Sequence, residues 1–539
     1  MTGADIVKKY EALEGNARGN WMNLWQECAD WCMPTNDNIN RIRVEGQEKP
    51  PQRMIDTCIE ANYNFASGFF SHLYPTNTLW AKYRHPNPAM MSRPGVSDYF
   101  EAVSRIVHQM LIGSNFAQEE FQSLLCMGTF GTNILSCEED EKKYMKFRNY
   151  TVDKMVIDEN YLGEVDMTGR KVKLTPRQAI QQFGEEALMK AQLERVMDDA
   201  RQVRDKKYEF IHMVAPRADF DSSKKDVTNK PFASYWVSCD TKEIVKESGF
   251  DYNPYKVARF ITGNDEVPGR GPMSMVLGTS RRTNSIYRSV IVSGEQHTNG
   301  QWLVPDDDSV SGLSGRAGAV IEWRIANGQF GKPERLSPNG DPGIGKDLLD
   351  MHDDQIKRMF FNHLFRTLDD YRNMTATEVN ERVTIDRMSI SPFVSRYLDE
   401  HVSPVMEFCY YVGQKRGLMP PMPAALTEDP NFEVEYIGPL AQSTASFETL
   451  GAIQTCRIFN ELGSVNPKFI QAQDYVDADV MFKETWHANS GSAGAINADE
   501  EVVEQREAQA QMMQQQQEID NMPAIADGMY KASQIEGQQ

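Results

Sequence analysis

The stretch Asp347–Val379, DLLDMHDDQIKRMFFNHLFRTLDDYRNMTATEV, decides how this chain is built. Its first part, Asp347–Thr367, repeats apolar side chains along one face and is predicted to be an amphipathic helix. Acidic residues fill the first turns of this segment and basic residues its last turns, which suits the dipole of a helix. Residues Leu368–Asn373 are then predicted to form a loop that leads into a second helix.

The hexapeptide Met374–Val379 marks where that second helix begins. Thr375 and Glu378 have the spacing of a capping box, in which each side chain accepts the backbone amide of the other residue. Met374 and Val379 stand at the positions of a hydrophobic staple. Such devices stabilise a helix end by about 1 kcal/mol each. Read alone, the hexapeptide is a well-capped helix start and nothing more.

A long helix is also predicted before this stretch, from about Met273 to Gln296, with Gly269–Pro272 as its start. Between the two helices lies a region rich in Gly, Ser, Asp and Pro. It contains the short apolar pieces Trp302–Val304 and Ala319–Ile321, which predict a small strand-and-loop module. The pattern is helix, module, helix, loop and capped helix.

The rest of the chain alternates between helical and strand-like patterns, so the predicted fold class is α+β and mainly helical. A helix with Ser391 as cap and Pro392 at its first position is predicted to run to Gly417, with a kink at Pro404. Further helices are predicted at 5–33, 53–73, 95–127 with a break at 113–115, 175–207, 440–487 and 499–518, and strands within 129–170, 208–262 and 432–436.

Composition limits the classes of function. The 539 residues carry 57 basic and 77 acidic side chains, a net charge of −20, which argues against a protein that grips nucleic acid but not against one that lets it slide past. No stretch is apolar enough to span a membrane, and Met1–Tyr10 lacks the apolar region of a secretory signal, which predicts a cytosolic protein. The eight cysteines contain no Cys-x-x-Cys pair, so free, buried thiols are expected rather than zinc.

No motif in the sequence has all the residues and the structural context that catalysis, cofactor binding or metal binding requires. No catalytic residue, cofactor or metal is therefore predicted, and the chain is not expected to be an enzyme. Gly340–Asp347 fits the phosphate loop G-x-x-x-x-G-K but ends in Asp347 where a hydroxyl should hold magnesium. No buried strand precedes it. A nucleotide hydrolase using residues 340–347 remains the alternative that this motif keeps open.

Pieces scattered along the chain resemble the portal proteins, the head-to-tail connectors of short-tailed, T7-like bacteriophages. Each piece alone is weak, and their shared order from residue 15 to residue 485 carries the resemblance. The matching pieces are Trp21 and Trp25 before Pro34, Asp56, Ala66–Gly68, Leu73–Pro75, Trp80, Gly128–Thr132, Gly269–Pro272, Met374–Val379, Arg396–Leu398, Glu400, Pro404 and Gly438–Ala441.

The resemblance implies a subunit with wing, stem, clip and C-terminal crown that assembles as a ring. The implied parts are wing at 1–265, stem helix at 266–298, clip at 299–345, stem helix and channel loop at 346–373, wing again at 374–440, and crown with C-terminal tail at 441–539.

The resemblance also implies a homododecameric ring at the unique capsid vertex, which serves double-stranded DNA packaging and ejection. Implied partners are the terminase large subunit as packaging motor, tail adaptor proteins, and major capsid and scaffolding proteins, with no membrane. The implied location is the virion, after assembly in the host cytoplasm. The alternative within this reading is another head-tail adaptor or a tail-tube ring protein.

The predicted loop 368–373 would line the narrow point of such a channel. Candidates for transient contacts with DNA are Arg358, Arg366, Asp369, Asp370, Tyr371, Arg372 and Asn373. Salt bridges between subunits are the alternative role for the arginines. The cap formed by Met374, Thr375, Glu378 and Val379 would fix the exit of the loop.

Overall fold

The computed structural model describes most of the chain up to residue 438. The described residues are 2–15, 18–36, 38–41, 53–76, 78–91, 93–202, 206–218, 220, 226, 229–299, 302–305, 320–323, 334–335, 342–365, 390–427, 429–438 and the single positions 482, 502, 506, 508 and 512. The chain divides into two compact units, residues 1–93 with 99–440 and residues 94–98 with 441–539. No helix within the described ranges is long and apolar enough to cross a membrane.

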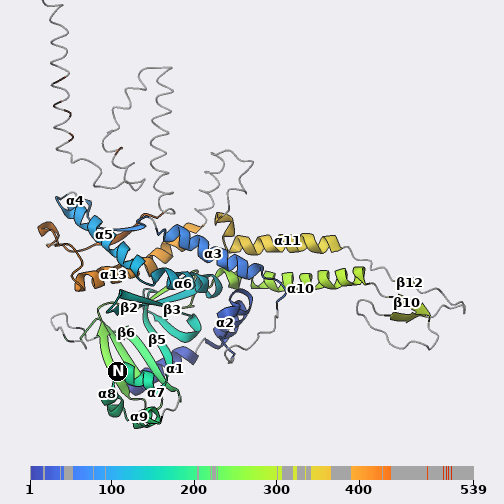
Figure 1. Ribbon diagram of the computed structural model, residues 1–539, viewed down its shortest axis with the longest axis horizontal. Coiled ribbons are helices and arrows are strands. Elements are labelled where there is room, and N and C mark those ends of the chain that lie inside the picture. Colours follow the sequence, from blue (N-terminus) through green and yellow to red (C-terminus); the bar gives the residue numbers. More distant parts are fainter. Residues whose placement is uncertain are drawn as a thin grey trace, which may run out of the picture. The chain divides into compact units, whose positions relative to one another are not determined.

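A five-stranded antiparallel sheet forms the base of the first unit, with its strands in sequence order (Figure 1). Side chains of β6 alternate between its two faces, because successive residues of a strand point in opposite directions. Ile211 and Met213 pack on helix α1 (Gly3–Gly15), while Tyr208 and Phe210 pack on the helices of the other face. The strands are β4 (Met155–Glu159), β5 (Val165–Leu174), β6 (Tyr208–Pro216), β7 (Phe232–Ser238) and β8 (Ile244–Phe250).

A second sheet, in the order β3-β2-β9, packs on the first. It consists of β2 (Thr132–Asp140), β3 (Tyr144–Tyr150) and β9 (Tyr255–Arg259). Ile134 and Val257 of this sheet share a buried apolar cluster with Val214 of β6. Tyr208, Phe210, His212 and Val214 alternate along β6 onto one face, and all four side chains are buried.

His212 is a buried polar group between these two sheets. Its Nδ1 lies 2.8 Å from the Tyr255 hydroxyl and its Nε2 lies 2.9 Å from the Ser234 hydroxyl. The ring also stacks on Trp236 at 4.3 Å. Burial, with a smaller contribution from the Arg170 charge, holds the pKa of His212 well below its ordinary value. The imidazole is therefore neutral in the folded protein.

The free energy of unfolding should consequently fall when the pH drops below about 6.5, the pKa of an unfolded histidine. The unfolded chain then binds a proton that the folded chain does not, which costs up to about 1.4 kcal/mol per pH unit. Urea unfolding at pH 7.5 and at pH 5.5 measures this loss. His212→Gln is the control, because it should lose less stability over the same interval, and an equal loss in both proteins would contradict the assignment.

Helices α2 (Arg18–Cys32), α3 (Thr57–Leu73), α5 (Val96–Gly113) and α6 (Phe116–Phe130) confirm the helices predicted in the first 130 residues, including the break at 113–115. Their cysteines, like Cys137 and Cys409, are buried free thiols, as predicted. The predicted strand near 432–436 is β13 (Glu433–Tyr436), which pairs antiparallel with β1 (Ala81–Arg84).

The helix predicted from Thr175 to about Lys207 is wrong as a single element. The structure has three short helices there, α7 (Pro176–Phe183), α8 (Glu185–Lys190) and α9 (Glu194–Arg201). Gly184, at φ 80°, ends the first of them, a backbone conformation outside the helical region. The turns allow apolar residues of all three helices to reach β6 and β7, a tertiary gain that the helical periodicity does not reveal.

The helix predicted to start at Ser391 is also wrong at its start, because Ile390 is already helical. Near Pro404, where a kink is predicted, the helix changes its hydrogen-bond pattern. The five residues Leu398–Val402 form a π-helical turn, here called the π-turn, directly before α13 (Ser403–Lys415). Proline has no N–H to bond to the carbonyl of the residue four before it, here Glu400, so the hydrogen-bond pattern is disturbed at this turn. The helix ends before Gly417, as predicted.

Candidate functional site: the α10–α11 hairpin

Helix α10 (Pro272–Thr298) confirms the first long helix of the predicted pattern. Pro272 stands at its first position, where the missing N–H is not needed. Residues up to Thr283 have buried positions, and the half of α10 that follows is mainly exposed or half-buried. The first half of α10 is therefore anchored in the protein, and its second half extends beyond that anchor.

Two glycine-rich segments cross at the start of α10. Gly131, at φ 79°, ends α6, and a Cβ placed on it would lie under 3.0 Å from backbone atoms of Arg270 and Gly271. The crossing is held by the Phe260 amide, which donates to the Gly131 carbonyl at 2.9 Å. The Gly269 amide donates to the Thr132 hydroxyl at 2.8 Å. Only glycine allows these backbones to approach so closely.

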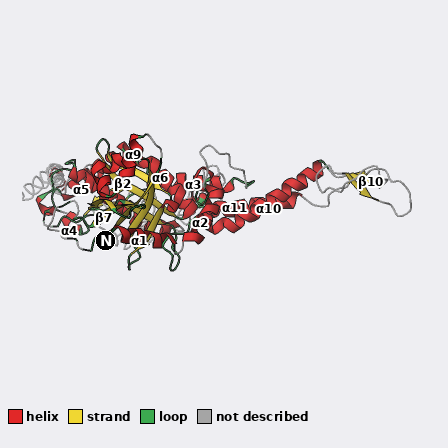
Figure 2. Ribbon diagram, turned by 90° about the horizontal axis from the view of Figure 1, so that it is seen from below, coloured by secondary structure: helices red, strands yellow, loops and turns green. Residues whose placement is uncertain are grey.

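Helix α11 (Pro342–Met359) runs back beside α10, as two views show (Figures 1 and 2). Gly345 at its start lies against the side chain of Val290, near the far end of α10. Near its other end, the Thr57 hydroxyl donates to Asp353 Oδ1 at 3.0 Å, and Lys357 lies 3.4 Å from Glu60. The two helices therefore form an antiparallel hairpin whose base is attached to α3.

A small three-stranded sheet lies between the two helices in sequence. Its strands β10 (Trp302–Pro305), β11 (Val320–Trp323) and β12 (Glu334–Arg335) pair in the order β11-β10-β12. This sheet confirms the predicted strands near Trp302 and Val320. The rest of the predicted module lies outside the described residues.

The predicted bounds of the second helix, Asp347–Thr367, are wrong at both ends. The helix begins at Pro342 and ends at Met359, where the chain turns through Phe361 at φ 57° into a 3₁₀ turn at Asn362–Phe365. Phe360 is fully buried against Phe65 of α3, with ring centroids 6.3 Å apart. Burial of this phenylalanine favours the turn over a longer helix.

The described chain stops at Phe365 and resumes at Ile390, and both ends pack on one aromatic cluster. The Phe393 ring lies 6.4 Å from the Phe65 ring and 4.4 Å from the Phe260 ring. Phe361 contacts Phe260 as well, at 6.1 Å. Residues 366–389 thus connect two points that the same cluster holds.

The predicted DNA-contact residues fall mostly outside the described part of the chain. Arg358 is described. It lies on the last turn of α11 with an exposed side chain, and among the described residues no carboxylate forms an ion pair with it. Arg366, Asp369, Asp370, Tyr371, Arg372, Asn373 and the cap residues Met374, Thr375, Glu378 and Val379 lie outside the described residues.

The structure does not support the phosphate-loop alternative. Gly343, Gly345 and Lys346 lie in the first turns of α11 rather than in a loop. The backbone of these residues is helical. They therefore do not form the loop whose backbone amides would surround a nucleotide phosphate.

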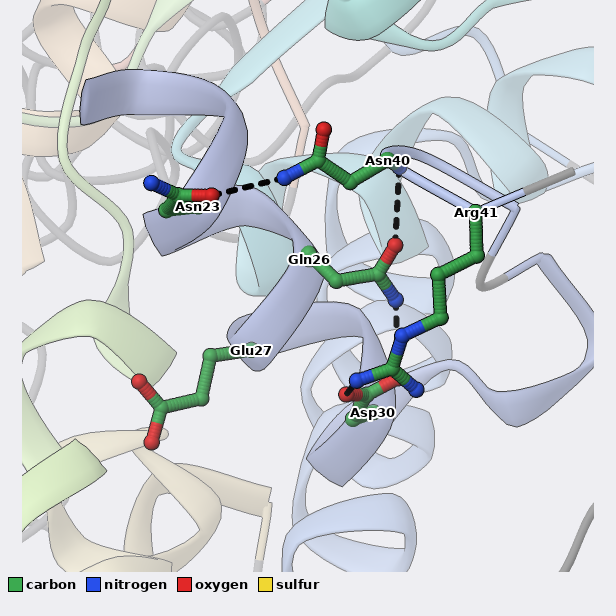
Figure 3. A pocket seen from close by; sticks show the side chains of 6 residues that line it. All are labelled: Asn23, Gln26, Glu27, Asp30, Asn40 and Arg41. Carbon is green, nitrogen blue, oxygen red and sulfur yellow. Dashed lines mark hydrogen bonds and ion pairs between the residues drawn. The ribbon is translucent and has the colours of Figure 1, made fainter. Parts of the chain in front are cut away.

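A polar pocket of about 450 Å³ lies beside α2, lined by Asn23, Gln26, Glu27, Asp30, Asn40 and Arg41 (Figure 3). Its side chains bond mainly to one another, since Gln26 accepts from the Asn40 amide at 2.8 Å and donates to Asp30 at 2.8 Å. Glu27 instead accepts from Arg281 of α10 at 2.5 Å. This arrangement joins α2 to the hairpin base.

The π-turn carries buried polar residues that the sequence patterns did not single out as a site. Glu120 of α6, Tyr397 and His401 are each fully buried. The Tyr397 hydroxyl donates to one carboxylate oxygen of Glu120, and His401 Nε2 lies 2.9 Å from the other. Burial and the Glu120 charge raise the pKa of Tyr397 well above its ordinary value. The residues are far apart in sequence, so no local pattern brings them together.

Arg259 joins the π-turn to both sheets. Its guanidinium donates to Glu400 at 2.8 Å, to Glu159 at 2.8 Å and to the Gly163 carbonyl at 2.7 Å. Its backbone amide also donates to Glu400, at 2.8 Å. The helix that follows residue 389 is therefore attached to the two sheets by the buried Arg259, and to α6 by the hydrogen bonds of Glu120 with Tyr397 and His401.

Comparison with known proteins identifies the family to which this arrangement belongs. The family model for the bacteriophage head to tail connecting protein matches residues 4–496. The portal protein of Salmonella phage epsilon15 is 24% identical over 98% of this chain and 95% of its own length. The probable portal protein of Bordetella phage BPP-1 is 22% identical over 86% of this chain and 83% of its own length. Because the family match spans nearly the whole chain, including the crossed glycine segments, the hairpin and the π-turn, the chain belongs to the bacteriophage head to tail connecting proteins.

Proposed function

We propose that copies of this chain form a homododecameric ring around a channel at the unique capsid vertex, through which double-stranded DNA is packaged and later ejected. Family membership supports the connector role. The main structural support for a channel is the α10–α11 hairpin, a pair of long helices anchored at one end. Repeated around a ring axis, such hairpins would form a helical wall.

The proposed division of the chain follows this hairpin. The stem comprises residues 266–298 and 346–373, the clip 299–345, the wing 1–265 and 374–440, and the crown with its tail 441–539. Support for the clip comes from the small β10–β12 sheet between the stem helices. We assign docking of the packaging motor, and then of tail adaptors, to the clip, and contacts with capsid and scaffolding proteins to the wing.

The charge of the chain fits DNA in transit rather than DNA held in place. A net charge of −20 keeps phosphate contacts few, and each contact that forms is screened and brief. Arg358 is an exposed cation on the last turn of α11. In this proposal, Arg358, Arg366 and Arg372 make the transient phosphate contacts.

Neutralising these three arginines together, as Arg358→Gln, Arg366→Gln and Arg372→Gln, should leave rings intact and change DNA passage. We expect the rate of packaging or ejection to change by a factor of about 5, equivalent to roughly 1 kcal/mol. Packaged genome length and ejection kinetics measure the effect. The matched control is Arg177→Gln, an exposed arginine on α7. If intact rings of the variant package and eject DNA normally, these arginines do not make the proposed contacts with DNA in the channel.

The proposed function itself is tested by electron microscopy of the purified full chain. Homododecameric rings with a central channel are the expected result. Particles without a channel would contradict it, and hydrolysis of ATP by the purified chain would favour the nucleotide hydrolase instead.

A further inference from the structure

The tip between β4 and β5 displays two apolar side chains to solvent. Tyr161 is 95% exposed and Leu162 is 64% exposed. Both are among the large apolar residues that the protein leaves in water, and they are adjacent. Exposed apolar pairs of this kind are typical of surfaces that contact other proteins.

The backbone of this tip is held by hydrogen bonds within the protein. Asn160 Oδ1 accepts from the amides of Leu162 and Glu164 at 2.9 and 3.0 Å, and the Asn160 amide donates to the Glu164 carbonyl at 2.8 Å. The Gly163 carbonyl accepts from buried Arg259. A partner that binds Tyr161 would therefore meet a loop that is already ordered, so little conformational entropy is lost on binding.

Acidic residues surround the tip. Asp158 and Glu159 precede it, and Glu164 and Asp166 follow it. Asp158 pairs with Lys9 at 3.0 Å and Glu159 pairs with Arg259 at 2.8 Å. Among the described residues, no cation forms an ion pair with Glu164 or Asp166. These two carboxylates repel DNA and favour a protein surface with basic side chains.

A surface with the complementary charge occurs on α10 of the same chain. The only acidic residue of α10 is Glu295, whereas Arg281, Arg282 and Arg288 are basic. Arg281 is neutralised by Glu27. Among the described residues, Arg282 and Arg288 form no ion pair, and both are exposed. Met275, 41% exposed, is seven residues before Arg282, so the two side chains lie on the same face of α10. Arg288 lies roughly a third of a turn away from that face.

We propose that the β4–β5 tip of one copy packs against the exposed face of α10 that carries Met275 and Arg282 on the next copy. This inference rests on the proposed ring. A contact between two different surfaces of identical subunits is heterologous, the type that closes a ring when repeated around an axis. Tyr161 supplies the aromatic anchor that dominates many interfaces, and Glu164 faces Arg282 of the neighbour. Because Arg259 holds both the tip and Glu400, the contact is also mechanically connected to the π-turn.

The test compares assembly of the wild-type chain with that of Tyr161→Ala/Leu162→Ala by analytical ultracentrifugation and electron microscopy. Both side chains are exposed, so circular dichroism and the melting temperature should stay unchanged. We expect the concentration needed for half-assembly to rise at least about 10-fold. The matched control is Met189→Ala on α8, which removes a 53% exposed apolar side chain away from the tip.

Charge exchange tests the partner surface. Glu164→Arg and Arg282→Glu should each weaken assembly, and the double variant should regain most of the loss. If the wild-type chain forms rings and the Tyr161→Ala/Leu162→Ala variant assembles equally well, this contact is overturned, but the proposed ring is not. Loss without recovery in the double variant would overturn the α10 assignment. Absence of rings from wild-type protein would overturn the proposed function, and the contact with it.

Discussion

Replacing Gly131 by alanine is expected to prevent the chain from folding into a form that assembles. A left-handed φ costs an alanine roughly 1–2 kcal/mol. The added Cβ would also lie under 3.0 Å from backbone atoms of Arg270 and Gly271, which side-chain rotation cannot relieve. Together these effects should exceed about 4 kcal/mol, a large part of the stability of most domains. Soluble yield and the midpoint of chemical unfolding measure the loss.

The matched control for Gly131 is Gly417→Ala. Gly417 also has a positive φ, of 68°, but open space surrounds the position of its missing Cβ. It should lose only about 1 kcal/mol, the cost of the backbone conformation alone. Similar losses at the two positions would show that the crossing of the two glycine segments can relax, and that the base of α10 does not depend on it.

Glu120→Leu should destabilise the protein by about 3–5 kcal/mol, since it removes the acceptor from two buried partners. His401 and the Tyr397 hydroxyl would be left in an apolar site without their carboxylate. Glu120→Gln, which keeps one acceptor oxygen, should lose about 1–3 kcal/mol. Denaturant unfolding measures stability, and hydrogen exchange of the amides of Leu398–Val402 should accelerate because this cluster holds the π-turn.

Glu186→Leu on α8 provides the comparison for Glu120. Its side chain is exposed, so the change should stay within about 0.5 kcal/mol. If Glu120→Leu were as mild, the buried carboxylate would not be what fastens the π-turn to α6.

Local patterns predicted the elements whose periodicity is strong. The helix expected at Met273–Gln296 is α10, Pro272–Thr298, because proline and the glycines before it mark a helix start in any context. The four residues on one face of β6 were likewise predictable, since strand geometry alone places alternate side chains together. Local steric rules for glycine and proline were enough to predict that α10 starts at Gly269–Pro272.

Other features depend on contacts between distant segments, and the same patterns misplaced them. Apolar residues continue helically to Leu364, yet α11 ends at Met359, because Phe360 gains more by packing on Phe65 than by extending a helix. Pro404 predicted only that the helix is disturbed near this position, whereas the π-turn is also held by Glu120 and Arg259, which belong to other elements.

The order of the main helices and strands, and the family, follow from the chain read residue by residue. Helix, module, helix and the resembling motifs are properties of the chain read in order, and the family match confirms the connector identity. Which of those motifs contact one another depends on the folded structure. Gly128–Thr132 and Gly269–Pro272 cross at the base of α10, and Tyr397 and Glu400 reach Glu120 and Arg259. Steric exclusion and the pairing of buried charge act between residues more than a hundred positions apart, so periodicity and spacing do not reveal them.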